Sequence, residues 1–517
     1  MGVQCVERGR SHRRGSRGRA TTSAVVGGAG WVLPAASGLP WSARSVDRVG
    51  AGRSDRRRCR RWKRGRVSWV CRGHGVNGAG SDRWIVREAT VGVARPPSTA
   101  LRFACIGDVH NLWSADDERL LREVVRPDVV LFVGDYGDEN VGLVRSVAAS
   151  AARLTALGDA NMPSAHRVRT VAAILGNHDA WYTATARGRR ASPYNHDMED
   201  RVREQLQALR HIDVGYGTRR VPLTSMPGAA SLSIVGGRPF SWGGPFWKPF
   251  DFYQQYYRVR DMRQSAERIV QAAECAMRQE AMRMDGGTGG SRAASSASPP
   301  PDTHNLVFLA HNGPYGLGDR ASSICGRDFV TPYDSGEPSG DFGCPDLQQA
   351  IAQLKQRSSR AGPHAAATAR VHVPLCVFGH MHEALFHGAS SIQRNMVTER
   401  DGTVYVNTAV VPRIRDASNT TDMRRVLGLP PPAIPHTVLT RAAWHQFTVI
   451  DTCWPASHAA DEDGERHPAT SRPGQLHVQR VMQCWLSDHR PDTASLTRVL
   501  YQAPAPMRQP AAYGVAE

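Results

Sequence analysis

The ten residues LRFACIGDVH, numbers 101 to 110, join an apolar run to a turn that carries an acid and a histidine. Leu101–Ile106 predicts a short buried strand that ends at Gly107. Asp108 and His110 are two residues apart, so both side chains leave an extended segment on the same side. In α/β sheets, the carboxyl ends of strands are where functional sites are built.

The same arrangement of an apolar run followed by polar residues recurs further along the chain. The later motifs are Gly134-Asp135, Gly176-Asn177-His178-Asp179, Ala310-His311-Asn312-Gly313 and Gly379-His380-Met381-His382. Glycine permits the sharp turns that let the polar side chains face a cleft. Carboxylate, amide and imidazole groups are ligands for Mn, Fe, Zn and similar ions. The motifs therefore predict a metal cluster built from several strand ends.

Strands and helices alternate in the residues that follow position 100. The first five predicted elements are strand Leu101–Ile106, helix Asp116–Val125, strand Val129–Val133, helix Val141–Leu157 and strand Thr170–Leu175. This order predicts an α/β fold with a largely parallel sheet. The later predicted strands are Ser231–Gly236, Leu306–Ala310, Leu375–Phe378, Thr403–Asn407, Phe447–Asp451 and Leu476–Gln483. Those from residue 403 onward lack intervening helices, which predicts a second, more antiparallel sheet behind the first. Tyr253–Met284 predicts one long helix that packs on the core or forms a lid.

Together the five motifs resemble the calcineurin-like metallophosphoesterase superfamily over about residues 101–412. The resemblance implies a four-layer α/β/β/α sandwich of two mixed sheets. The stretches GDVHNLW and FLAHNGPYGLGDRASSICGRDF look most similar to a cyanobacterial and plastid branch of unassigned substrate. The expected activity is metal-dependent hydrolysis of a phosphate monoester or diester.

The resemblance also implies two divalent metal ions (Mn, Fe, Zn or similar) with ligands at defined positions. These are Asp108, His110 and His382 for the first ion, Asn177, His311 and His380 for the second, and Asp135 as a bridge between them. A water bridging the two ions would give a hydroxide near neutral pH that attacks the phosphoryl group in line. The expected substrate is a phosphorylated small molecule or a nucleotide-like compound.

Two further residues receive catalytic roles from the resemblance. His178 would face the substrate, as proton donor to the leaving oxygen or as a partner of the phosphoryl group, and Asp138 would orient His178. Arg238 and Arg320, with Arg327, are candidate phosphate ligands because a guanidinium offers a planar fork of donors. A surface salt bridge is an equally good interpretation of each arginine.

The chain departs from one branch of the superfamily. Ser/Thr protein phosphatases carry GDxxDRG and an arginine before GNHE, whereas this chain has Gly134-Asp135-Tyr136-Gly137-Asp138-Glu139-Asn140 and the pair Ile174-Leu175 before GNHD. The two phosphate-binding arginines of that branch are therefore missing, which argues against a protein phosphatase of that kind. A nuclease with the same metal core and a non-catalytic scaffold on the same fold remain alternatives.

The charge of the chain is concentrated near its N-terminus. Residues 1–100 hold 21 Lys and Arg against 5 Asp and Glu, whereas the remaining residues hold 44 against 42. A nucleic-acid-binding domain would spread basic residues over its folded surface, so nucleic acid is not the expected partner. An Arg-rich, acid-poor N-terminus is typical of organelle transit peptides. It predicts a plastid protein, or alternatively a mitochondrial one, that meets the organelle import machinery. There are two alternatives. The segment could be a disordered arm that binds nucleic acid or an anionic surface through phosphate contacts, or it could be translated non-coding sequence from a start codon placed too far upstream.

These observations predict a division of the chain into three parts. Residues 1–95 form a disordered basic targeting extension, 96–454 the metallophosphoesterase domain with insertions near 182–305 and 356–370, and 455–517 C-terminal strands and a tail that complete the same domain. The ten cysteines are scattered and form no C-x-x-C pair, so free thiols are expected. No run of 18 apolar residues is present, which predicts no transmembrane helix.

Overall fold

The computed structural model describes most of the chain that follows residue 92 and two short strands before it. The described residues are 69–70, 84–88, 93–156, 168–223, 230–285, 303–327, 340–360, 370–384, 394–416, 443–454, 474–488 and 494–504. They belong to one compact unit that spans residues 67–328 and 339–517. Most of the predicted extension 1–95 lies outside the described residues. Among the described residues, no helix combines the length and hydropathy of a membrane span.

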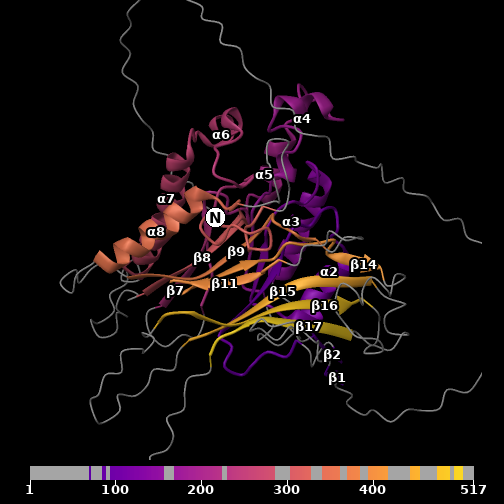
Figure 1. Ribbon diagram of the computed structural model, residues 1–517, viewed down its shortest axis with the longest axis vertical. Helices are drawn as coiled ribbons and strands as arrows, with labels where there is room; N and C mark the ends of the chain where they lie inside the picture. Colours follow the sequence, from indigo (N-terminus) through magenta and orange to yellow (C-terminus); the bar gives the residue numbers. More distant parts are fainter. Residues whose placement is uncertain are drawn as a thin grey trace, which may run out of the picture. The chain divides into compact units, whose positions relative to one another are not determined.

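Sheet A contains the first motif strands and the C-terminal strands (Figure 1). Its order is β1–β2–β17–β16–β15–β3–β4–β5, with β14 paired to β15. The strands are β1 Trp69–Val70, β2 Trp84–Glu88, β3 Leu101–Ile106, β4 Val129–Phe132, β5 Thr170–Ala173, β14 Ile414–Asp416, β15 Ala443–Cys453, β16 His477–Ser487 and β17 Ala494–Gln502. β3, β4 and β5 are parallel, whereas β15, β16 and β17 are antiparallel to their neighbours.

Sheet B contains the strands that carry the later motifs. Its order is β11–β12–β9–β8–β7–β6. The strands are β6 Thr218–Arg220, β7 Ala230–Gly236, β8 Thr303–Asn312, β9 Arg370–Gly379, β11 Val397–Arg400 and β12 Thr403–Asn407. The four central strands are parallel, and β6 and β11 add antiparallel edges. A separate short pair joins β10 Glu383–Ala384 to β13 Val410–Val411.

The two sheets pack face to face through alternate residues of their strands. Phe103 and Cys105 of β3 belong to the same buried apolar cluster as Leu309 of β8 and Val377 of β9. The intervening Ala104 of β3 belongs to a second cluster that includes helix residues. Successive side chains of β3 thus point to opposite faces of the sheet, as expected for a strand that is buried on both faces.

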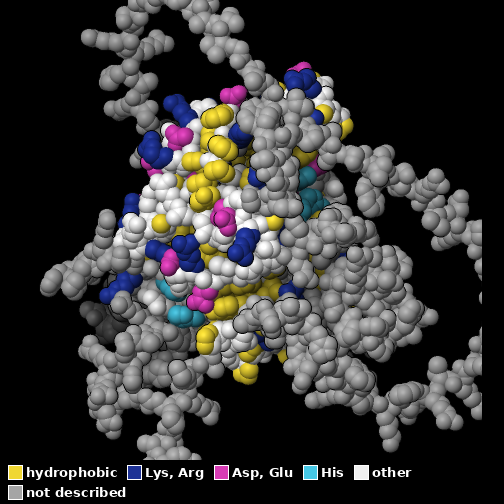
Figure 2. Space-filling model, viewed as in Figure 1, with side chains coloured by type: hydrophobic (Ala, Val, Ile, Leu, Met, Phe, Trp, Pro, Cys, Tyr) yellow, Lys and Arg dark blue, Asp and Glu magenta, His cyan; other side chains and the backbone are white. Residues whose placement is uncertain are grey.

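Helices cover the outer faces of both sheets. They are α2 Ala115–Leu120 with a continuing π-turn Leu121–Val125, α3 Val141–Thr155, α4 Ala186–Ala191, α5 Arg201–Leu209, α6 Phe250–Tyr257, α7 Met262–Asp285 and α8 Pro345–Arg360. α3 packs against β5 and α5, while α7 packs against β7 and α8 against β9. Figure 1 shows α7 and α8 side by side over sheet B, and Figure 2 shows hydrophobic side chains gathered on the surface near α6 and α7. The predicted α/β/β/α arrangement of two mixed sheets is confirmed.

Three details of the predicted fold differ from the structure. The single helix predicted over Tyr253–Met284 is two helices, because Arg258 takes a left-handed conformation with φ of 58° and Asp261 caps α7 through the Gln264 N–H. The late strands β15, β16 and β17 extend the first sheet instead of building the second. Strands β1 and β2 lie inside the predicted extension, where β2 pairs with β17.

The state of the described cysteines agrees with the expectation of free thiols. All seven cysteines among the described residues are free, and five of them are buried: Cys105, Cys325, Cys344, Cys376 and Cys484. Burial raises the pKa of the Cys484 thiol to about 12, so this group stays protonated and inert at neutral pH.

Candidate metal centre

The polar motif residues lie at the carboxyl ends of five strands. Asp108 and His110 follow β3, Asp135 follows β4, and Asn177 with His178 follows β5. In sheet B, His311 is near the end of β8, and His380 and His382 follow β9. Because all of these strand ends point the same way in the face-to-face sheets, side chains from both sheets meet between them.

The backbone at these strand ends is tightly constrained. Asp108, His110, Asp135 and His380 all have positive φ, between 40° and 69°. Such conformations are rare for residues with a Cβ and cluster at functional sites. A Cβ at Gly379 would lie 2.4 Å from Asp108 Oδ1, so the turn before His380 can approach the carboxylate only as glycine.

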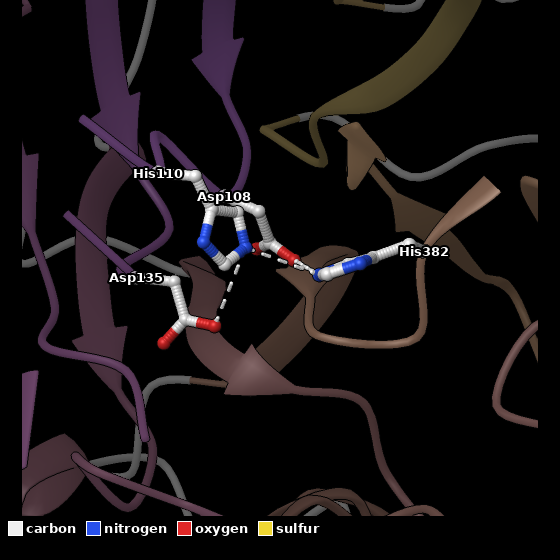
Figure 3. Close-up of side chains that lie close together, drawn as sticks. All are labelled: Asp108, His110, Asp135 and His382. Atoms are coloured by element: carbon white, nitrogen blue, oxygen red, sulfur yellow. Dashed lines mark hydrogen bonds and ion pairs between the residues drawn. The ribbon is translucent and has the colours of Figure 1, made fainter. Parts of the chain in front are cut away.

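The first group of potential ligands contains Asp108, His110, Asp135 and His382 (Figure 3). One ligand atom from each lies within 4.8 Å of all the others. His382 Nε2 is 2.6 Å from Asp108 Oδ2 and 3.4 Å from His110 Nε2, and His110 Nε2 is 3.9 Å from Asp135 Oδ2. The structure therefore brings together all three residues predicted for the first ion and the predicted bridge.

The second group contains Asp135, His311 and His380, and so shares one carboxylate with the first. His311 Nε2 is 3.4 Å from Asp135 Oδ1 and 2.9 Å from Asn177 Oδ1, which brings the predicted amide ligand to the same place. Asp135 is 1% exposed and His311 is fully buried. The single carboxylate between the two groups lies where a bridge is predicted.

The pKa shifts of Asp135, His380 and His110 favour the forms that bind metal, whereas Asp108 outweighs burial and raises the pKa of His382. Burial opposes ionisation of Asp135, but the imidazoles of His311 and then His178 hold the pKa of its carboxyl well below its usual range. Burial lowers the pKa of His380 to about 3, and His311 adds to this effect. Burial also lowers the pKa of His110. Ionised carboxylates and neutral imidazoles are the forms that bind metal.

The second group also shows why a cation fits. His311 Nδ1 lies 2.9 Å from the Val133 carbonyl oxygen and donates to it, which leaves Nε2 directed at Asn177 Oδ1 and Asp135 Oδ1. A divalent cation bound here would be held by one imidazole nitrogen and two oxygens. This set of ligand atoms suits Mn, Fe or Zn.

His178 lies beside the metal ligands without belonging to either group. Its ring meets the His110 ring edge to face at 5.0 Å, and its Nδ1 is 2.6 Å from Asp138 Oδ1. Burial works against protonation of this ring, but the charge of Asp135 and the hydrogen bond to Asp138 raise the pKa of His178 to about 9. His178 and Asp138 are therefore paired as predicted, and the role of His178 as a proton donor stays a prediction.

The two arginines predicted as substrate contacts have different environments, one buried and one exposed. Arg238 is 2% exposed, its Nε is 3.2 Å from Asp346 Oδ2, and its guanidinium lies over the Trp247 ring. A buried and ion-paired guanidinium is unavailable to a substrate, so the structure contradicts the prediction for Arg238. Arg320 is exposed in the loop that follows β8, and its role stays a prediction.

Two residues near the site have roles that sequence reasoning missed. Asp179 is fully buried, and its two carboxylate oxygens accept the N–H groups of Tyr136 and Gly176, which ties the turns after β4 and β5 together. Trp181 stacks on His178 with ring centroids 4.6 Å apart and planes 4° apart. Asp179 follows His178 within its motif, which was a usable signal, whereas nothing in the sequence marks Trp181.

A comparison with protein families identifies the family of this chain. The family model for calcineurin-like phosphoesterases matches residues 101–384, more than half of the chain, while no curated protein matches it. Two solved structures are similar to this chain. Phosphopantetheinyl hydrolase (PptH) from Mycobacterium tuberculosis has 12% identity and a TM-score of 0.26, covering 61% of this chain and 90% of that chain. PhoD has 10% identity and a TM-score of 0.26, covering 79% of this chain and 72% of that chain. With its five motifs gathered in one place and the family match spanning them, this chain belongs to the calcineurin-like phosphoesterase family.

Proposed function

We propose that the chain hydrolyses phosphate esters with two divalent cations held between its two sheets. The observation that carries this proposal is the sharing of one buried carboxylate, Asp135, by two convergent groups of ligands. One group supplies Asp108, His110 and His382, and the other supplies His311 and His380, joined by Asn177. A pair of cations held in this way would supply an activated water molecule and neutralise charge on the phosphoryl oxygens.

The residues of the chain would fix these ligands before substrate arrives. The His178 backbone N–H donates to Asp135 Oδ1 at 2.9 Å, and the His380 backbone N–H donates to the Asp108 carboxylate at 3.1 Å. These bonds orient the carboxylates toward the centre. Since little reorganisation is left to occur during reaction, such a site stabilises developing charge efficiently.

His178 would complete the reaction as a general acid. Asp138 holds Nδ1, which leaves Nε2 to give its proton to the oxygen of the departing alcohol. His178 is about a quarter exposed, so it is accessible from solvent while its neighbours Asp108 and Asp135 are not. The lost proton would be regained from water after the product leaves.

The test is hydrolysis of p-nitrophenyl phosphate and of bis(p-nitrophenyl) phosphate by the full chain with added Mn. We expect turnover of at least one ester, loss of it in Asp135→Asn, and retention of it in Asp116→Asn, an exposed acid outside the site. Metal content is measured for each protein. Absence of turnover in a protein that binds two metals per chain would contradict the proposed activity toward simple esters. Absence of both turnover and metal would contradict the whole proposal.

We also propose import into an organelle, with the plastid as the first candidate. The support is the basic, acid-poor composition of residues 1–100. The test is a fluorescent protein fused behind residues 1–100 and expressed in a plant or algal cell. Fluorescence confined to plastids would support the proposal, mitochondrial fluorescence would favour the alternative organelle, and diffuse fluorescence would contradict import.

A further inference from the structure

One wall of the metal centre is aromatic, and it begins at His178. The short helical turn His178–Ala180 ends at Trp181, whose N–H donates to the His178 carbonyl. The indole of Trp181 stacks on the His178 ring, and it also stacks on Trp242 with centroids 5.5 Å apart and planes 4° apart. The three rings are nearly parallel, although Trp242 comes from a separate loop between β7 and α6.

The wall continues from Trp242 to the other end of the site. A Cβ at Gly243 would lie 2.6 Å from the Phe342 carbonyl oxygen, and one at Gly244 would lie 3.0 Å from the Phe342 ring. Phe342 in turn lies nearly parallel to the His380 ring, 17° apart with centroids at 6.4 Å. We call Trp181, Trp242 and Phe342 the aromatic rim. Trp181 stacks on His178 at one end, and Phe342 lies beside His380 at the other. Between them, the N–H of Gly244, two residues after Trp242, donates to the Phe342 carbonyl at 2.7 Å.

Trp181 is the exposed member of the rim. Six large hydrophobic side chains are exposed among the described residues, and Trp181, at 38%, is the one tryptophan. Leaving an indole in water forfeits much of its potential hydrophobic stabilisation. Its stacking on two other rings also holds it rigid. The part of the indole that these two rings leave uncovered is rigid and exposed, so it is preorganised to receive a ligand, because little side-chain entropy is lost on contact.

The position of Trp181 indicates which part of a substrate would reach it. His178 would protonate the leaving oxygen, so the organic group attached to that oxygen lies beside His178. Trp181 stacks directly on His178 and is the nearest exposed apolar surface that the structure shows there. A flat π-system gains most from an indole by stacking or edge contact, whereas an aliphatic group gains only from burial.

We infer that Trp181 makes the enzyme selective for phosphate esters whose leaving group carries a planar aromatic ring. The ring could belong to a nucleobase or to an aryl group, and both share the chemistry that the rim would recognise. This inference rests on the proposed function. A purely structural role is the competing interpretation, in which Trp181 only holds His178 in place.

The test uses substrate pairs that release the same kind of primary alcohol. Adenosine 5′-monophosphate is compared with ribose 5-phosphate, and benzyl phosphate with cyclohexylmethyl phosphate. The methyl diesters of all four are included in case the enzyme cleaves diesters. The ratio of kcat/KM within each pair is measured for the full chain with Mn, for Trp181→Leu and for Trp181→Phe. Melting temperature and bound metal confirm that each variant is folded.

We expect the aromatic member of at least one pair to be favoured by about ten-fold or more, the range known for base–aromatic stacking. Trp181→Leu should bring that ratio close to one, and Trp181→Phe should retain part of it. Preference in the first pair alone identifies a nucleobase, and preference in the second alone identifies an aryl group. Equal loss of both members in Trp181→Leu, with an unchanged ratio, would show that Trp181 only positions His178 and would overturn the inference. A wild-type ratio near one in every pair would overturn it too. Failure to hydrolyse any ester, the p-nitrophenyl esters included, would instead refute the proposed function.

Discussion

Replacement of Asp117 by asparagine tests how the first metal-binding turn is held in place. Asp117 of α2 is fully buried, and its Oδ1 accepts hydrogen bonds from Arg413 at 2.8 Å and from His445 of β15 at 2.9 Å. Arg413 also donates to the Leu112 carbonyl, two residues after His110, at 2.6 Å. The Asp117→Asn side chain has nearly the same shape but leaves the buried guanidinium without an anionic partner.

The expected cost follows from the ion pair and from the pKa of the acid. Burial of Asp117 opposes ionisation, but Arg413 and then His445 hold its pKa at about 2, compared with about 3.9 in an unfolded chain. That difference corresponds to about 2 to 3 kcal/mol at neutral pH. Breaking a buried pair by removing one partner typically costs about 3 to 5 kcal/mol. We therefore expect Asp117→Asn to lower the free energy of unfolding by about 2 to 5 kcal/mol.

The assay is chemical denaturation at several pH values, with Asp116→Asn as the matched control. Asp116 is on the same helix but half exposed, and it pairs with Arg119, so its loss should cost less than about 1 kcal/mol. Because the folded-state pKa of Asp117 is depressed, its stabilisation is complete above about pH 4 and is lost as the pH falls toward 2. The difference between wild type and Asp117→Asn should shrink over that window. An equal cost for both variants, or a cost independent of pH, would refute the reasoning.

Four further predictions concern catalysis and metal binding. His178→Ala should lower kcat by about 10² to 10⁴-fold with unchanged metal content, because His178 is in neither ligand group; loss of metal would contradict this. In the metal-free protein, the charge of Asp135 and the hydrogen bond to Asp138 outweigh burial and raise the pKa of His178 to about 9, so Asp138→Asn should lower the pKa of His178 in an NMR titration of the metal-free protein. Chelation should abolish turnover and lower the melting temperature, and added Mn should restore both. Gly379→Ala should reduce metal content by displacing Asp108, whereas Gly142→Ala in α3, with its nearest contact at 3.4 Å, should not.

The gathering of the candidate ligands was predictable because each of them is tied to a short local pattern. An apolar strand, a glycine and a polar residue were enough to place Asp108, Asp135 and His380 at strand ends, and the topology then brought them together. The same reasoning did not predict the buried ion pair of Arg238. A guanidinium after a Gly-Gly turn looks suited to phosphate, but its pairing with Asp346 depends on how a distant helix packs, which no local pattern records.

The strand assignments beyond the motifs were less complete for a similar reason. Periodicity identified β15 and β16 as strands, but which sheet they join depends on pairing between segments hundreds of residues apart. The break between α6 and α7 depends on a left-handed Arg258, a conformation that arginine adopts only when its surroundings stabilise it. Trp181 was missed because its meaning comes from stacking on Trp242, a partner from another loop.

The pairing of β3 with β15 has a consequence for biosynthesis. Every proposed metal ligand lies between residues 108 and 382, yet the strand that leads to Asp108 pairs on one side with residues 448–452. A nascent chain emerging from the ribosome would therefore expose the open edge of β3 until this late segment follows. Unpaired strand edges promote association between chains, and contacts of such sequence separation form slowly. The ligands are thus all synthesised well before their scaffold can close, which makes chaperone engagement or early metal capture most important during that interval.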